Sequence, residues 1–168
     1  MSKKMSCRQT LAITNHRIIA SDLNEHETVY GGNLLQLLDG TASVSAARFA
    51  RTQCVTASIE HVDFLKPFAL NDSLCIESYV TGCGNSSIEV FVKITGEHLN
   101  TGERFLGLTA FMTFVTLDRS VKLPEIYPES AEEKMLCEDF SKRRKLQQEN
   151  RRLRKEFQQK LDLELPWL

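Results

Sequence analysis

The chain has 168 residues, of which 42% are hydrophobic and 26% charged, and its formal net charge is −1. This length usually makes one compact domain, and a charge so close to zero argues against a protein built to bind nucleic acid. No apolar run is long enough to cross a bilayer, and no apolar segment follows the N-terminal lysines as a secretory signal requires. We therefore expect a cytoplasmic protein that contacts neither nucleic acid nor membrane.

The first 120 positions alternate apolar and polar residues, which predicts strands with one buried face. A first strand is expected over residues 9–19, followed by a polar loop. Residues 33–50 are predicted to form a helix with one apolar face. Four side chains recur there at helical spacing: Leu35, Ala42, Ala46 and Phe49.

Three further runs, residues 55–60, 74–80 and 88–94, alternate like strands, and a turn at 82–87 joins the last two. A loop then leads into a long final strand over 104–117. A long helix followed by antiparallel strands is the α+β order of a helix wrapped by a curved sheet. The uncovered edges of such a sheet favour dimerisation.

The composition changes after this region. Residues 122–130 carry two prolines and are predicted to be a linker, and residues 132–161 are basic, helix-prone and free of Gly and Pro. We expect a solvated helix lying on the assembly, with a short coiled coil between subunits as the alternative. The predicted apolar seam is sparse: Leu146, Leu153, Phe157 and Leu161.

The five cysteines are scattered and form no CxxC pair: Cys7, Cys54, Cys75, Cys83 and Cys137. Zinc sites and disulfide frameworks usually show short or regular spacings. The sequence therefore predicts neither, and we expect no bound metal.

Asp39 is the most informative residue, because helical spacing places it inside the predicted apolar stripe. A carboxylate there must be paired, desolvated or placed at the mouth of a cavity, since uncompensated burial costs about several kcal/mol. One interpretation is a structural acid bonded to a neighbouring loop. The other is a general base or nucleophile.

Gly31 and Gly32 directly precede the predicted helix. Their N–H groups and the positive end of the helix dipole could face an oxygen that carries negative charge, although an ordinary tight turn explains a Gly-Gly pair equally well. Asn24, in the preceding loop, is explained on its own by turn chemistry. His16 and His26 are predicted to be surface residues, because no spacing links them to Asp39.

Four segments, in order, resemble the acyl-CoA hydrolase branch of the hotdog-fold thioesterases: SDLNEHETVYGGNLLQLLDGTASVSAARFA, VTASIEHVDFLKPFALNDSL, GCGNSSIEVFVKI and LTAFMTFVTLD. The resemblance covers about residues 8 to 125. We therefore expect residues 1–125 to form a hotdog acyl-CoA thioesterase domain, with residues 126–168 as linker and charged helix.

The resemblance implies a homodimer with two active sites at the subunit interface, often assembled as a trimer of dimers. It places the catalytic acid on Asp39, the loop amide on Asn24 and the helix-end N–H group on Gly32. Further substrate contacts are expected from these residues: Gly31, Thr56, Lys66, Ser86 and Ser87. No cofactor is expected, since coenzyme A is part of the acyl-CoA substrate.

Two positions depart from the family pattern. Glu27 stands where many members have Gly, which bears on the loop geometry, and Asn85 stands where members often have Arg. Asn85 cannot supply positive charge to a phosphate of coenzyme A, so this segment offers the phosphates no cation.

Two other functions are compatible with the same fold. A non-catalytic acyl-CoA sensor is the alternative, but a DNA-binding sensor normally carries a helix-turn-helix before this domain, and fewer than ten residues precede the first predicted strand. A dehydratase normally needs a His on the long helix, and residues 33–50 contain none.

Overall fold

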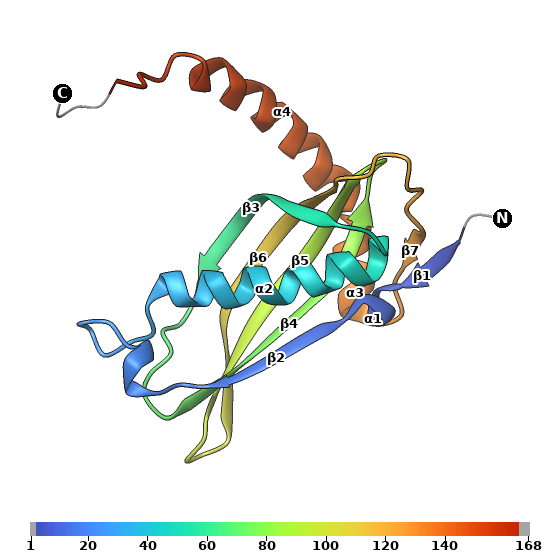
Figure 1. Cartoon of the computed structure of the whole chain (residues 1–168). Coiled ribbons are helices and arrows are strands. Elements are labelled where there is room, and N and C mark those ends of the chain that lie inside the picture. The colour runs from blue at the N-terminus through green and yellow to red at the C-terminus, as the bar shows by residue number, and fades with distance from the viewer. Residues whose placement is uncertain (1–2, 165–168) are drawn as a thin grey trace.

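The computed structural model describes residues 3–164. Five strands form one antiparallel sheet in the order β2-β4-β5-β6-β3. Their bounds are β2 (Ala12–Arg17), β3 (Cys54–Phe64), β4 (Asp72–Cys83), β5 (Ser87–His98) and β6 (Glu103–Thr116). Helix α2 (Gly31–Ala50) lies along one face of this curved sheet (Figure 1). The predicted α+β arrangement of a long helix and a curved antiparallel sheet is confirmed.

The main core lies between α2 and the sheet. The alternating residues of β5 that face α2 are fully buried: Ile88, Val90, Val92 and Ile94. On α2, Ala42 and Ala46 are also fully buried, and such small side chains let a helix approach a sheet closely. This packing fixes the rotation of α2 about its axis and so decides where Asp39 points.

Helix α2 differs from the prediction in its start and in its buried stripe. It begins at Gly31, two residues before the predicted start, so the two glycines form its first turn. Leu34 and Leu38 are buried, whereas Leu35, which we expected in the stripe, is only half-buried. The helix therefore packs through a face rotated from the predicted one.

The predicted first strand is wrong at both ends. Residues 7–10 form a helical turn, α1 (Cys7–Thr10), because Ser6 and Gln9 cap each other's backbone N–H groups. Strand β2 covers only Ala12–Arg17, and a short 3-10 turn, η1 (Ala20–Asp22), follows it.

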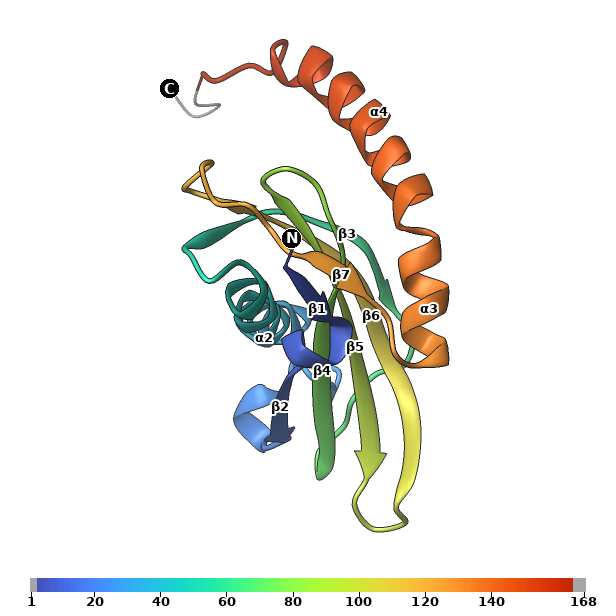
Figure 2. The ribbon, with the colours of Figure 1, turned by 90° about the vertical axis from the view of Figure 1, so that its right-hand side faces the viewer.

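The predicted linker contains a strand. Strand β7 (Glu125–Tyr127) pairs in parallel with β1 (Lys4–Ser6), so the two ends of the domain lie side by side (Figure 2). The linker prediction is wrong at these positions. The expected boundary between residues 125 and 126 falls inside β7, and the division into two parts stays a prediction.

The C-terminal helices lie across the sheet from α2 (Figure 2). Helix α3 (Ala131–Glu138) and helix α4 (Phe140–Gln158) are separated only by Asp139. The prediction of a helical tail is confirmed over these spans, although Leu161 lies beyond the end of α4. Leu146, Leu153 and Phe157 are exposed, so the predicted seam does not pack on its own chain.

Helix α3 covers a second, smaller apolar cluster on this outer face of the sheet. Its Leu136 and Cys137 pack against Cys7, Tyr79 and Phe91. The Sγ atoms of Cys7 and Cys137 lie 3.6 Å apart, and the five cysteines are free thiols. The cluster joins the N-terminal turn α1 to the C-terminal helix α3.

A half-buried ion pair between Glu132 and Lys93 also holds α3 against the sheet. Glu132 Oε1 accepts a hydrogen bond from Tyr79 Oη at 2.8 Å, and Lys93 Nζ lies 2.9 Å from Glu132 Oε2. Burial alone would raise the pKa of Glu132, but hydrogen bonds from Lys93 and Tyr79 lower that pKa below the usual glutamate value. Glu132 therefore binds the sheet in its charged form.

The first turns of α4 are held by polar contacts. Arg143 Nη2 and Nε donate to the two carboxylate oxygens of Glu89 at 2.7 and 3.1 Å, and the guanidinium lies 4.3 Å from the centre of the Phe111 ring. One turn later, Gln147 Nε2 donates to Thr113 Oγ1 at 2.6 Å. No residue of α4 is buried. None of the helices within residues 3–164 combines the length and the apolar character of a membrane span.

Candidate active site

Asp39 meets Thr56 at the contact between α2 and the edge strand β3. Thr56 Oγ1 donates a hydrogen bond of 2.6 Å to Asp39 Oδ1. Asp39 is half-buried at the margin of the α2 stripe, so the expectation that it lies inside the apolar face is corrected. The carboxylate is paired, and its Oδ2 has no hydrogen-bond partner among residues 3–164.

The Gly-Gly pair forms the first turn of α2. Tyr30 is the residue before the helix, and its side chain makes no capping hydrogen bond. The first N–H groups of a helix have no partner inside the helix. Within the described chain, the N–H groups of Gly31 and Gly32 donate to no backbone or side-chain acceptor, and they lie at the positive end of the helix dipole. This end of α2 can therefore bind an oxygen with negative charge.

Gly31 and Lys66 lie together in a cavity of about 300 Å³. Its walls come from the start of α2 and from the segment after β3, and they are mostly apolar: Thr28, Val29, Leu34, Phe64, Leu65, Pro67 and Phe68. The two residues expected to contact substrate from these separate segments are thus neighbours in space.

Asn24 organises the loop that leads to α2. Its Oδ1 accepts hydrogen bonds from the backbone N–H of His26 at 2.9 Å and from Thr28 N and Oγ1 at 3.2 Å. This is the turn chemistry expected of Asn in a loop. The Nδ2 donor at the other end of the same amide has no partner among the described residues, while the bonds to Oδ1 fix its orientation.

Glu27 keeps the loop geometry that its residue type disfavours. Its φ angle is 60°, in the left-handed region where Gly is the usual residue. A non-glycine residue there costs about 1–2 kcal/mol. Glu27 in place of the family's Gly therefore makes the turn less stable, but the backbone of the turn stays left-handed.

His16 and His26 take no part in the Asp39 pair. His16 Nε2 lies 2.8 Å from Asp22 Oδ2, and His26 is exposed beside Glu25. Hydrogen bonds from the Ile19 N–H and from His16 lower the pKa of Asp22 below its usual value. This pair belongs to the turn η1. His16 is half-buried, so the prediction of a surface residue holds only for His26.

The predicted site residues fall into four places within one chain, one of which is the loop of Asn24 before α2. Asp39 and Thr56 meet in the middle of α2, and Gly31 and Lys66 meet at its start. Ser86, in the turn before β5, and Ser87, the first residue of β5, line a groove beneath α4. At 1.5 Å per residue, Gly32 and Asp39 are about 10 Å apart along the helix, so they do not converge on one atom within one chain.

The groove contains basic residues that were not among the expected site residues. Arg144, Arg151 and Arg154 line it from α4. Their spacing of seven and three positions puts them on one side of a helix. The sequence alone could therefore have predicted a basic side of this helix. Among residues 3–164, no group of three or more His, Cys, Asp or Glu is placed to hold a metal ion.

Comparison with known proteins decides the family. The thioesterase superfamily model matches residues 26–103. YkhA of Bacillus subtilis, named an uncharacterized acyl-CoA thioester hydrolase, is 43% identical, over 96% of this chain and 95% of that protein. The chain belongs to the acyl-CoA hydrolases of the thioesterase superfamily. Its expected identity as a thioester hydrolase is therefore confirmed.

Solved structures of acyl-CoA hydrolases share its fold. The Staphylococcus aureus acyl-CoA hydrolase, solved with coenzyme A as an alanine variant of an asparagine, has a TM-score of 0.90 and 29% identity over 98% of this chain and 100% of that one. Alanine variants of an aspartate and a threonine of that enzyme have also been solved. A hexameric acyl-CoA thioesterase has a TM-score of 0.84 and 32% identity over 88% of this chain and 97% of that one. The hotdog fold is confirmed.

Proposed function

We propose that the protein hydrolyses acyl-CoA thioesters at a site shared by two subunits, with Asp39, Asn24 and the Gly32 amide as its reacting groups. The hydrogen bond that holds the Asp39 carboxylate against Thr56 carries this proposal. In the S. aureus enzyme, the asparagine, aspartate and threonine replaced by alanine are separated by 15 and then 17 positions, and Asn24, Asp39 and Thr56 have the same separations here. This agreement supports a functional role for all three.

Asp39 supplies the base or the nucleophile. Thr56 donates to Oδ1 and fixes the carboxylate, while Oδ2 remains available to the substrate side. In one route Oδ2 takes a proton from water as the water oxygen bonds to the thioester carbonyl carbon. In the other route the carboxylate attacks that carbon itself, and water then hydrolyses the anhydride. In both routes the carbon–sulfur bond breaks, and the coenzyme A thiolate takes a proton.

The Gly32 amide and Asn24 act on the carbonyl oxygen. The N–H groups at the start of α2 carry the partial positive charge of the helix dipole and have no partner in the described chain. A donor placed where the oxyanion develops lowers the barrier by about 3–4 kcal/mol. Asn24 Nδ2 adds a second donor, because Oδ1 of the same amide is held by the loop.

Sharing between subunits explains the separation of these groups. A second copy could place its own Asp39 near the α2 start of the first copy, which a single chain cannot do across about 10 Å of helix. The surface needed for this assembly is present, since within residues 3–164 β3 pairs only with β6 and its other edge is open. Val55, Ile59 and Phe64 are exposed along this strand. An open edge with exposed apolar residues favours pairing with a second copy.

Higher assembly is part of the same proposal. The hexameric relative supports a homo-oligomer, and we expect a hexamer built as a trimer of dimers. The cavity that holds Gly31 and Lys66 offers an apolar wall and one cation to the arm of the substrate next to the thioester. We also keep the expectation of a cytoplasmic location and of a reaction without a cofactor.

Mixed dimers test the shared site. Asn24→Asp keeps the Oδ1 acceptor that holds the loop but removes the Nδ2 donor, and Asp39→Asn removes the base. Each variant alone should be inactive on an acyl-CoA panel of short, long and aryl chains. After subunit exchange, activity should return to roughly a quarter of wild type, because half the dimers are mixed and one of their two sites is intact.

Exchange between two Asp39→Asn preparations, one of them tagged, is the matched control and should restore nothing. If verified exchange of the two different variants also restores nothing, the shared site is wrong. A wild-type protein that binds acyl-CoA but hydrolyses no member of the panel would instead be the non-catalytic acyl-CoA sensor.

A further inference from the structure

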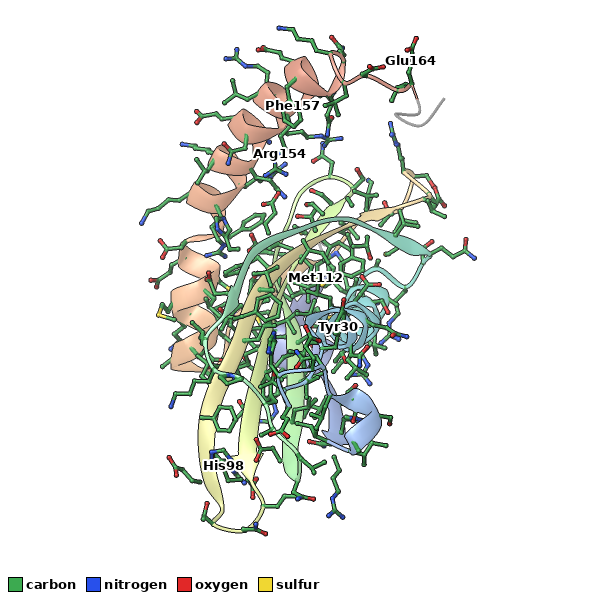
Figure 3. The ribbon with its side chains drawn as sticks, turned by 90° about the vertical axis from the view of Figure 1, so that its left-hand side faces the viewer. Tyr30, His98, Met112, Arg154, Phe157 and Glu164 are labelled. Carbon is green, nitrogen blue, oxygen red and sulfur yellow. The ribbon has the colours of Figure 1, made fainter. Side chains whose placement is uncertain are left out.

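Helix α4 and the outer face of the sheet enclose a groove of about 550 Å³. Hydroxyl groups line its sheet side, from β3, β6, the start of β5 and the turn before it: Ser58, Ser86, Ser87, Thr113 and Thr116. Long basic and amide side chains line its helix side: Arg144, Gln147, Gln148, Arg151, Arg154, Lys155 and Gln158. Figure 3 shows Arg154 on the side of α4 that faces the sheet. Such walls suit a polar ligand.

The groove lining contains cations of α4 but none of its acids. Four cations of the helix line the groove, whereas its two acids, Glu149 and Glu156, do not. Arg119 adds a fifth cation, and Glu60 is the one carboxylate in the lining. Five cations and one carboxylate give the lining of the groove a net positive charge.

The cations of the groove are largely unpaired. Arg154 lies 3.9 Å from Glu60, which is the single ion pair of the groove among residues 3–164. Arg144 and Arg151, like Arg119 and Lys155, have no carboxylate within 4.0 Å in the described chain. In contrast, the neighbouring Arg143 is fully engaged by Glu89. Several cations gathered without counter-charge repel one another, so an anion in the groove would relieve an existing cost.

Arg144 reaches the turn that holds the serines. A Cβ atom on Gly84 would lie 2.7 Å from Arg144 Nη2 and 2.7 Å from Ser87 Oγ. The absence of a side chain at Gly84 therefore makes room for the guanidinium beside Ser87. Asn85 in this turn carries no charge, so the cation at the turn comes from α4.

We propose that this groove binds the phosphate-bearing nucleotide end of coenzyme A, with Arg144 and the turn serines on one side and Arg151 and Lys155 on the other. The ligand must carry several negative charges, and this end of coenzyme A has a diphosphate and a 3′-phosphate. Its position also fits, because Thr56 holds Asp39 and the next residues of β3, Ala57 and Ser58, line the groove. The inference rests on the proposed function for its choice of ligand.

Substrates that differ only in the nucleotide end test this assignment. Arg144→Gln and Arg151→Gln should each raise KM for acyl-CoA about 10- to 100-fold, as expected for loss of a charged hydrogen bond, with kcat within about threefold. KM for the same acyl group on N-acetylcysteamine, which has no phosphate, should not change. Arg152→Gln, one position along α4 but outside the groove lining, is the matched control and should shift KM less than about twofold.

A rescue variant separates charge from structure. Asn85→Arg returns a cation to the same turn and should restore much of the KM that Arg144→Gln loses. An unchanged KM for acyl-CoA in Arg144→Gln and Arg151→Gln would overturn the assignment, and so would equal losses with the N-acetylcysteamine thioester.

Calorimetry with adenosine 3′,5′-bisphosphate tests the groove without catalysis. Weaker binding in both groove variants, and normal binding in Arg152→Gln, should accompany the KM effect, and this result stands even if the protein hydrolyses no thioester. Weaker binding with an unchanged KM would show that the groove takes a free nucleotide, which overturns its role in substrate binding.

Discussion

Helices α2 and α4 are nearly equal in length, 20 and 19 residues, but they meet the sheet in opposite ways. Helix α2 buries eight residues, among them Leu38, Ala42 and Phe49, whereas α4 buries none. Burial on this scale fixes the position of α2 closely, because close-packed side chains transmit small displacements. Helix α4 is held mainly by charged and amide side chains such as Arg143 and Gln147.

This difference in burial suggests that the two faces of the sheet have different functions. Chemistry at a thioester needs groups held within a fraction of an ångström, and Asp39 lies on the helix that the core holds in place. Recognition of a phosphate-rich group needs charge more than rigidity, and the basic groove lies beneath the helix that is held by its first turns. The inner face should therefore control kcat, and the outer face should control KM and stability.

Replacement of Asp39 tests the inner face and should have the largest effect. Asp39→Asn keeps the volume and can still accept a hydrogen bond from Thr56, but it removes most of the basicity. We expect kcat to fall by roughly two to four orders of magnitude while the Tm stays within a few degrees. Steady-state kinetics and thermal unfolding measure both quantities.

Asp63→Asn is the matched control for this change. Asp63 is an exposed carboxylate on β3, outside the Asp39–Thr56 contact, and its loss should leave kcat within about twofold. A folded Asp39→Asn protein with near-normal kcat would show that Asp39 is a structural acid bonded to its neighbour. The inner face of the sheet would then no longer be the face that controls kcat.

The inner face was largely predictable from sequence. Strict alternation in β5 and helical spacing in α2 follow directly from burial, and they located the sheet, the helix and Asp39. The depth of Asp39 was not predictable, because it depends on which side of α2 packs on the sheet, and the choice of Leu34 over Leu35 is made by tertiary contacts. The hydrogen bond between Asp39 and Thr56 was not predictable either, because it depends on how α2 packs against β3.

The outer face was less predictable. Its contacts join residues far apart in sequence, such as Glu132 with Lys93 and Arg143 with Glu89, and no local pattern announces them. The linker reading failed because β7 gains its partner only from the other end of the chain, at β1. The helical spacing of the arginines on α4 could be seen in the sequence. The strand residues that line the other side of the groove could not be predicted from it.

Two truncations sharpen the comparison on the outer face. Removal of residues 131–168 uncovers Tyr79 and Phe91, which α3 helps to bury, and should lower the free energy of unfolding by about 2–4 kcal/mol. Removal of residues 149–168 keeps α3 together with Arg143 and Gln147, and should lower it by less than about 1 kcal/mol. In both truncated proteins kcat should stay within about threefold.

Urea unfolding measures the free energy of unfolding, and steady-state kinetics measure kcat. The protein that lacks only residues 149–168 is the control for the protein that lacks residues 131–168. Equal stability losses would mean that α3 does not protect the apolar cluster. A truncated protein that stays folded and dimeric but loses nearly all hydrolysis would show that the tail reaches the reacting groups, against the division between the faces.

The smallest expected effect concerns the charge that ties α3 to the sheet. The pKa of Glu132 is lowered, so its contribution to stability is fully present above the usual glutamate value of 4.5 and is lost as pH falls through the lower folded value. Glu132→Gln should therefore cost less than about 1 kcal/mol at pH 7, since the pair is partly solvent-exposed, and nothing measurable well below pH 4.5. Glu138→Gln, on the same helix without an ion pair among the described residues, should cost nothing at either pH. A difference between wild type and Glu132→Gln that persists unchanged at low pH would place its origin in packing, because a charge effect must vanish once the carboxyl group is protonated in both the folded and the unfolded chain.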